Sequence, residues 1–216
     1  MAYDFTATST RYLNFNAPAT TWPITMACQF NPKNITTGMM LMYIGNKLGT
    51  SRFLLAANGD VAGDPLAAGV SNSTNTVVLV NSTSGYSANI WSHACGVFES
   101  ASSTSVYLNG ANSATNTTAL GGSLTNINTG AVGMQWVSNS VASLASSLIA
   151  EVGIWNAALT AAEIASLAKG MTCDKVRPQS LVFYAPLVRN LQDAKGGLTI
   201  TNNGGATVAT HPRVYA

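Results

Sequence analysis

Charged side chains are scarce in this sequence. Asp, Glu, Lys and Arg make up 8% of the 216 residues, against roughly 25% in ordinary soluble domains. The net charge is +2 and the basic residues form no stripe, so we expect no nucleic-acid partner. Ser, Thr, Asn, Ala and Gly are expected to occupy the surface in place of charged residues. This composition fits either a secreted protein or a surface covered by neighbouring molecules, because burying charge is costly.

Cysteine and histidine are also few. Cys28, Cys95 and Cys173 are odd in number and far apart, with no C-x-x-C pair. This argues against a disulfide framework and against a thiolate zinc site. The two histidines, His93 and His211, leave little room for a metal centre or a catalytic triad.

Long apolar runs are missing as well. No stretch approaches the ~20 residues that a membrane span needs. The opening residues MAYDFTATST have neither the basic nor the apolar region of a signal peptide. We therefore expect no membrane contact and a protein made in the cytoplasm.

What the sequence does contain is a series of short strand patterns. Ile24, Met26, Cys28 and Phe30 alternate with polar or small residues, which predicts a half-buried strand with Cys28 in the core. The apolar run 38–45 predicts a strand buried on both faces. Asn-Gly pairs at 58–59 and 109–110 predict type I′ hairpin turns. The opening Tyr3/Phe5 and Leu13/Phe15 runs predict a hairpin, and 131–137 and 181–184 predict further strands.

Residues 148–170 change from strand to helix. Residues 148–155 alternate, with Ile149, Glu151, Gly153 and Trp155 expected on one face and the intervening residues on the other. Thr160 and Glu163 have the spacing of a capping box. Gly170 is typical of the residue that follows the C-terminal end of a helix. We therefore predict one short helix from Thr160 to Lys169.

Two segments resemble known domains. Residues 151–167 resemble the last strand and helix of laminin-G-like and pentraxin-like domains, which belong to the concanavalin A-like lectin/glucanase superfamily. Ala150 stands where that family usually has Asp. Residues 91–110 resemble the family's W-x-H-V-A-G-V-F and Y-V-N-G motifs. The resemblance implies an all-β, antiparallel jelly-roll sandwich. We expect a laminin-G-like region over 1–170, with 171–216 completing the sandwich or forming an arm to a neighbour.

The residues argue against catalysis. Glucanases of this superfamily carry an E-x-D-x-x-E strand, and retaining enzymes hold two carboxylates about 5–5.5 Å apart. Glu151 has no acidic residue within eight positions on either side. There is no G-x-S-x-G, H-E-x-x-H, P-loop or dinucleotide motif. We expect a protein that is not an enzyme and has no cofactor; a glucanase would have to depend on Glu151.

Three candidate sites remain open. Asp60 and Asp64 could supply oxygens to calcium, as the resemblance suggests, or they could cap a turn. Trp136 could be a stacking platform for a sugar, or it could pack under the sheet. His93 is expected to be a hydrogen-bonded core residue.

The missing leader, the low charge and the ending HPRVY, which resembles the tails of phage laminin-G-like proteins, together suggest a phage virion structural protein. It would decorate the capsid or form part of a head or tail fibre, contact the major capsid protein or other virion proteins, and form a homo-oligomer. The residues with interface character are His211, Arg213 and Tyr215. The alternative is a carbohydrate-binding, lectin-like adhesion module that recognises a host surface glycan.

Overall fold

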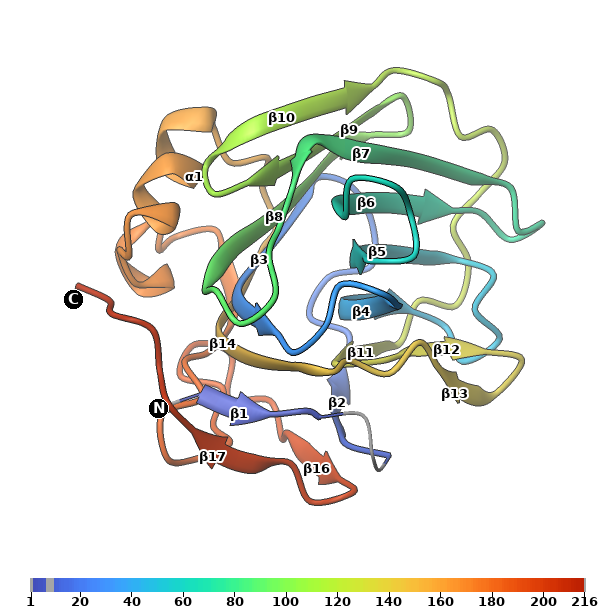
Figure 1. Cartoon of the computed structure of the whole chain (residues 1–216). Coiled ribbons are helices and arrows are strands. Elements are labelled where there is room, and N and C mark those ends of the chain that lie inside the picture. Colours follow the sequence, from blue (N-terminus) through green and yellow to red (C-terminus); the bar gives the residue numbers. More distant parts are fainter. Residues whose placement is uncertain (1, 7–9, 216) are drawn as a thin grey trace.

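A computed structural model describes residues 2–6 and 10–215 of the chain. Two antiparallel β-sheets pack face to face, and a short helix lies outside them (Figure 1). The expected all-β sandwich is confirmed. The strands are β1 (Ala2–Asp4), β2 (Tyr12–Asn16), β3 (Ile24–Pro32), β4 (Gly38–Gly45), β5 (Arg52–Asn58), β6 (Pro65–Ser71), β7 (Val77–Gly85), β8 (Ser92–Ser100), β9 (Ser103–Leu108), β10 (Ala111–Asn116), β11 (Thr129–Val132), β12 (Gln135–Val137), β13 (Ser140–Ala142), β14 (Ser147–Trp155), β15 (Leu181–Ala185), β16 (Thr201–Asn203) and β17 (Thr207–Ala209).

The eight-stranded sheet has the order β10-β9-β8-β3-β14-β1-β17, and β15 also pairs with β14. The seven-stranded sheet has the order β16-β2-β11-β4-β5-β6-β7. Strands β12 and β13 form a separate hairpin. The last 46 positions of the chain thus contribute β15 and β17 to one sheet and β16 to the other. Here β17 pairs with β1, so strands from the two chain ends lie side by side (Figure 1).

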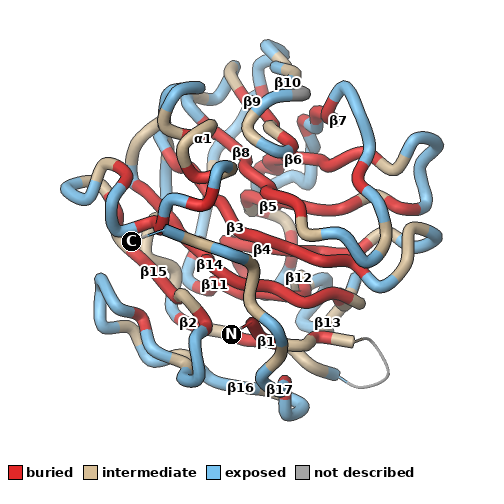
Figure 2. Tube along the Cα trace, turned by 60° about the vertical axis from the view of Figure 1, so that its left-hand side comes forward, coloured by how far each residue is buried: buried red, intermediate tan, exposed pale blue. Residues whose placement is uncertain are grey.

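The main core lies between the sheets, where the central strands are buried along most of their length (Figure 2). Cys28 lies in this core with Ile24, Met26 and Phe30, as predicted. The prediction that β3 is half-buried is wrong. All nine of its residues are buried, because a second cluster, built from helix α1 (Ala161–Ala168) and the following segment, covers the outer face of β3.

Strand β14 does not keep the predicted alternation. Ile149 faces the main core, but so do Val152 and Ile154, which were expected on the opposite face. The cause is a bulge between Ala150 and Gly153, where Glu151 has a φ of +51°. A bulge inserts one residue into a strand and so reverses the facing of every residue after it.

The expected opening hairpin is also wrong, and its expected turn residues 7–9 lie outside the described part. Strand β1 pairs with β14 and β17, whereas β2 pairs with β11 and β16 in the other sheet. The type I′ turn at Asn109-Gly110 is confirmed, with φ values of +55° and +73°. The one at Asn58-Gly59 is wrong, because a longer turn joins β5 to β6 and its positive φ angles fall on Gly63 and Asp64.

Helix α1 spans Ala161–Ala168, and the predicted end residues Thr160 and Lys169 are its N-cap and its C-cap. The Thr160 hydroxyl accepts a hydrogen bond from the Glu163 amide, and the Glu163 carboxylate accepts one from the Thr160 amide at 2.7 Å. Arg177 closes this arrangement with two hydrogen bonds to the same carboxylate, at 2.8 and 2.6 Å. Among the described residues, no helix has the length and apolar character to cross a bilayer.

Candidate functional site

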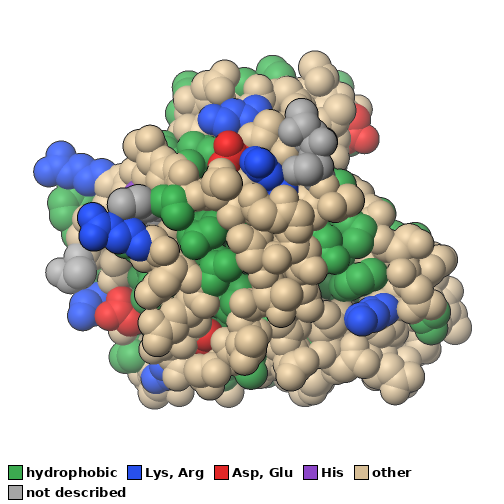
Figure 3. Space-filling view, turned by 90° about the horizontal axis from the view of Figure 1, so that it is seen from below, with side chains coloured by type: hydrophobic (Ala, Val, Ile, Leu, Met, Phe, Trp, Pro, Cys, Tyr) green, Lys and Arg blue, Asp and Glu red, His purple; other side chains and the backbone are tan. Residues whose placement is uncertain are grey.

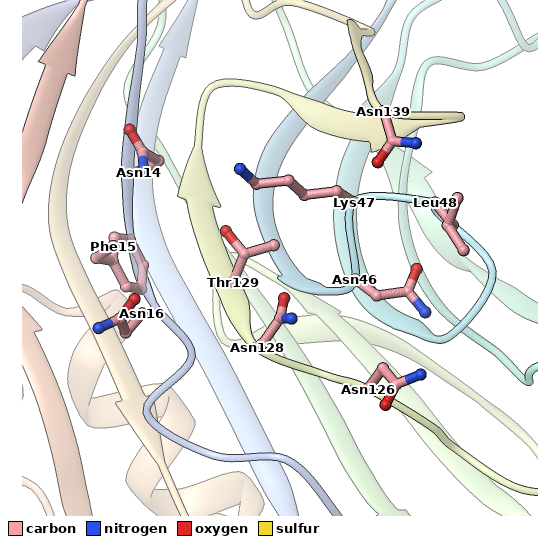
Figure 4. A pocket seen from close by; sticks show the side chains of 10 residues that line it. All are labelled: Asn14, Phe15, Asn16, Asn46, Lys47, Leu48, Asn126, Asn128, Thr129 and Asn139. Carbon is pink, nitrogen blue, oxygen red and sulfur yellow. The ribbon is translucent and has the colours of Figure 1, made fainter.

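A cleft of about 660 Å³ opens on the outer face of the seven-stranded sheet. The cleft residues come from four places: β2, the connection after β4, the segment that leads into β11, and the tip of the β12–β13 hairpin (Figure 4). Six of the ten are asparagines. They are Asn14, Phe15, Asn16, Asn46, Lys47, Leu48, Asn126, Asn128, Thr129 and Asn139.

The alternation of β2 brings its asparagines to this face. Leu13 and Phe15 are buried between the sheets, so Asn14 and Asn16 point outward. Asn16 lies directly across from Thr129 of β11 in the antiparallel register. Cross-strand neighbours on one face have Cβ atoms roughly 5 Å apart. The sheet therefore sets polar groups beside one another along the floor of the cleft.

Hydrogen bonds within the chain hold the walls. The Tyr43 hydroxyl donates to the Asn46 carbonyl at 2.5 Å, and the Asn46 side chain donates to the Thr125 carbonyl at 3.3 Å. The backbone amide of Asn128 donates to the Gly45 carbonyl at 3.0 Å. At the hairpin tip, the backbone amide of Asn139 donates to the Lys47 carbonyl at 2.8 Å. The wall segments are thus fixed before any ligand arrives.

Four side-chain amides in the cleft remain free. Among the described residues, the side chains of Asn16, Asn126, Asn128 and Asn139 make no hydrogen bond within the chain, and all four residues are exposed. Each amide offers a carbonyl acceptor and two N–H donors. Within the described part of the chain, Lys47 is the one charged residue that lines the cleft, and no carboxylate lines it. The cleft therefore suits a neutral ligand rich in hydroxyl groups and does not repel an anionic one.

Trp136 lies next to the cleft but does not line it. Its ring packs on the outer face of the seven-stranded sheet, partly buried, with the Tyr12 ring edge-on at 6.4 Å. The Lys47 ammonium lies 5.1 Å from the ring centre on the cleft side. A sugar that stacked on this face of the ring would have to displace Lys47. The role of Trp136 as a platform stays a prediction.

The two acidic candidates for calcium lie in the β5–β6 turn. Asp60 is exposed, and Asp64 has a φ of +48° with its carbonyl taken by the Tyr86 amide. Calcium takes six to eight oxygens. The described residues bring no cluster of three His, Cys, Asp or Glu side chains together anywhere. Two carboxylates in a turn do not by themselves fit a built calcium site.

The three residues expected at an interface differ in how far they are exposed. His211 turns inward, with its Nε2 3.3 Å from the Glu151 carboxylate and only 11% of its side chain exposed. Tyr215 is 56% exposed, and Arg213 lies over its ring. Contact with a neighbouring protein through Arg213 and Tyr215 stays a prediction.

His93 is buried in β8 as expected, but its ring lacks the expected hydrogen bond. Neither ring nitrogen finds a partner among the described residues. Burial lowers the pKa of His93 to about 4. The imidazole is therefore neutral in the folded protein at physiological pH.

A family model described as the concanavalin A-like lectin/glucanases superfamily matches residues 7–165. The chain belongs to this superfamily. No curated protein matches it in sequence.

Solved structures support the same fold. The chain is similar to a heptameric SAP-like pentraxin from Limulus polyphemus, with a TM-score of 0.67 and 15% identity over 95% of this chain and 93% of that one. It is similar to a putative carbohydrate binding protein from Bacteroides ovatus, with a TM-score of 0.65 and 18% identity over 100% of this chain and 61% of that one. It also resembles the CBM40 of a Ruminococcus gnavus sialidase bound to α2,3-sialyllactose, with a TM-score of 0.62 and 10% identity over 77% and 96%. At these identities the likeness shows the fold.

Sequence reasoning did not find the asparagine cleft. Its residues span positions 14 to 139 in the chain, and no motif connects them. The available signal was the alternation of Asn14 and Asn16 with the buried Leu13 and Phe15, which assigns both asparagines to the outward sheet face.

Proposed function

We propose that this protein is a non-enzymatic carbohydrate-binding module and that the asparagine cleft holds the sugar. The observation that carries this proposal is that, among the described residues, four side-chain amides of the cleft have no hydrogen-bond partner and the lining includes one lysine and no carboxylate. Sugar hydroxyls both donate and accept hydrogen bonds, so amide groups match them in both directions. A ligand that meets fixed donors and acceptors loses less free energy to ordering them.

The acidic residues support binding without hydrolysis. Glycoside hydrolysis commonly uses a pair of carboxylates across the scissile bond. Glu151, the residue on which a glucanase would depend, is 5% exposed and lies on the other sheet, and its carboxylate is engaged by Tyr184 and His211. The cleft itself is lined by no acid.

The test is a glycan array of neutral and sialylated glycans, followed by calorimetric titration of the hits. We expect Asn16→Ala and Asn128→Ala each to weaken binding roughly threefold to tenfold, which corresponds to about one net hydrogen bond. Neither Asn16 nor Asn128 has a positive φ. Asn126 and Asn139 have positive φ, so changing them would add backbone strain to the lost contact.

Asn156→Ala is the matched control. Asn156 is exposed, its side chain makes no hydrogen bond within the described chain, and it lies at the end of β14 outside the cleft. Its removal is expected to leave sugar affinity unchanged. The proposal is overturned when no glycan binds, or when all three variants bind as the wild type does.

A phage structural role remains a second proposal. The charge-poor surface, on which uncharged side chains and backbone dominate one whole face (Figure 3), fits a protein covered by neighbours. Co-purification with capsids, together with a measurement of mass in solution, tests both this role and the expected homo-oligomer.

A further inference from the structure

A second cleft, of about 570 Å³, lies beside the asparagine cleft. Residues from the β2–β3 connection, including Thr21 and Trp22, form one wall, and the segment 122–127 forms the other. Both volumes fall within the roughly 300–1,000 Å³ that small-molecule sites occupy. The two clefts share Asn126 as a lining residue.

The wall that the two clefts share is firmly held although it has no regular secondary structure. The Asn72 side chain donates to the Gly121 carbonyl at 2.8 Å, and the Ser73 amide donates to Ser123 at 3.0 Å. The Thr125 amide donates to the Ser51 hydroxyl at 3.0 Å. Asn126 then takes a φ of +55°, a conformation that Asn adopts more readily than most residues.

Trp22 gives the second cleft what the first lacks, an aromatic surface that lines it directly. The Trp22 ring is only partly buried and rests edge-on against Phe53, 5.9 Å away. A flat aromatic ring beside hydroxyl and amide groups suits a sugar ring, which has an apolar C–H face and a polar rim.

We infer that the ligand is a neutral oligosaccharide chain that runs from the asparagine cleft past Asn126 onto Trp22, so that chain length determines affinity. This inference rests on the proposed function. It adds that a disaccharide fills the asparagine cleft, whereas a longer chain fills both clefts and gains the contact with Trp22.

The experiment titrates the wild type with neutral disaccharides and hexasaccharides of four series: cello-, malto-, xylo- and arabino-oligosaccharides. In the series that binds, we expect the hexasaccharide to bind at least tenfold tighter than the disaccharide. Trp22→Ala should abolish that gain, so that the variant binds the hexasaccharide no tighter than the disaccharide. Asn128→Ala should weaken both ligands by the same factor.

A spectroscopic readout on the wild type guards against a Trp22→Ala variant that fails to fold. The indole N–H resonance of Trp22, assigned with Trp22→Phe, should shift with the hexasaccharide and stay in place with the disaccharide. Trp155 is the internal control, because its indole N–H is buried and donates to the Val176 carbonyl at 2.8 Å.

The outcomes separate the two claims. When no hexasaccharide of any series binds, the extended site is overturned, and the proposed function falls with it only when the glycan array shows no binding either. When sugars bind with an affinity independent of chain length and the Trp22 resonance does not move, the extended site alone is overturned.

Discussion

The Tyr184 hydroxyl donates a hydrogen bond of 2.7 Å to the Glu151 carboxylate and so joins β15 to the bulge of β14. Burial, reinforced by the nearby carboxylate, raises the pKa of Tyr184, which keeps the phenol protonated as a donor. Nε2 of His211 lies 3.3 Å from the other oxygen of the same carboxylate. A buried acid in a positive-φ position is thus held by partners from two C-terminal segments.

Removing the Tyr184 hydroxyl tests this arrangement. We expect Tyr184→Phe to lower the free energy of unfolding by about 1–3 kcal/mol, because a buried carboxylate loses a hydrogen-bond donor. Urea denaturation measures the change. Tyr107→Phe is the control, since the Tyr107 hydroxyl makes no hydrogen bond among the described residues. Equal losses in the two variants would contradict the role given to the Tyr184 hydroxyl.

His93 predicts a loss of stability in mild acid. The unfolded imidazole titrates near pH 6.5, and burial lowers the pKa of the folded one to about 4. Because the unfolded chain takes up the proton first, the stability contributed by neutral His93 is complete above pH 6.5 and is lost as the pH falls toward 4. The loss amounts to about 2 kcal/mol between pH 7 and pH 5.

The variant His93→Leu should remove this part of the pH dependence. At pH 7 we expect its stability to equal or exceed that of the wild type, because two buried nitrogens without partners disappear. Urea denaturation of both proteins at pH 7 and pH 5 measures the difference, and His211 is present in both. Parallel losses in wild type and variant would show that His93 is not responsible.

The capping box predicts the effect of losing the Thr160 hydroxyl. Thr160→Ala should destabilise the protein by about 1 kcal/mol, because the Glu163 amide at the start of α1 loses its acceptor. Thr117→Ala serves as the control, since Thr117 is exposed and its side chain makes no hydrogen bond among the described residues. Thermal unfolding of both variants tests this. An unchanged Tm for Thr160→Ala would show that the capping box does not stabilise the helix.

Calcium should not stabilise the protein. A metal that binds only the folded state raises Tm by mass action, but Asp60 and Asp64 offer two carboxylates in one turn and no third acidic side chain joins them among the described residues. We expect equal Tm values in EDTA and in millimolar calcium chloride. A rise with calcium that Asp60→Asn abolishes would establish the site.

Local patterns in the sequence were enough to predict several elements of the structure. The capping box sets the start of α1 because its two partners are three residues apart. The Asn109-Gly110 turn follows from the φ preferences of its own residues. Cys28 could be placed in the core because β3 keeps a regular period of two. Each of these depends on interactions over a few residues.

The errors in β14 and in the opening hairpin involve partners distant in sequence. The pattern of β14 is regular, yet Glu151 forms a bulge, where its side chain contacts Tyr184 and His211. Strands β1 and β2 look like a hairpin, but they pair with strands far along the chain. Sequence patterns report which face of a strand is apolar, and they do not report which strand lies beside it.

The sequence by itself determined the fold class, through the resemblance of two segments to laminin-G-like domains. It also determined the helix and the shortage of charge, because capping and composition do not depend on distant contacts. Only the tertiary structure decided that six asparagines between positions 14 and 139 share one cleft. It also decided that Glu151 is enclosed on the opposite sheet. The physical reason is that a site built on facing strands and loops exists only after the sheet register brings them together.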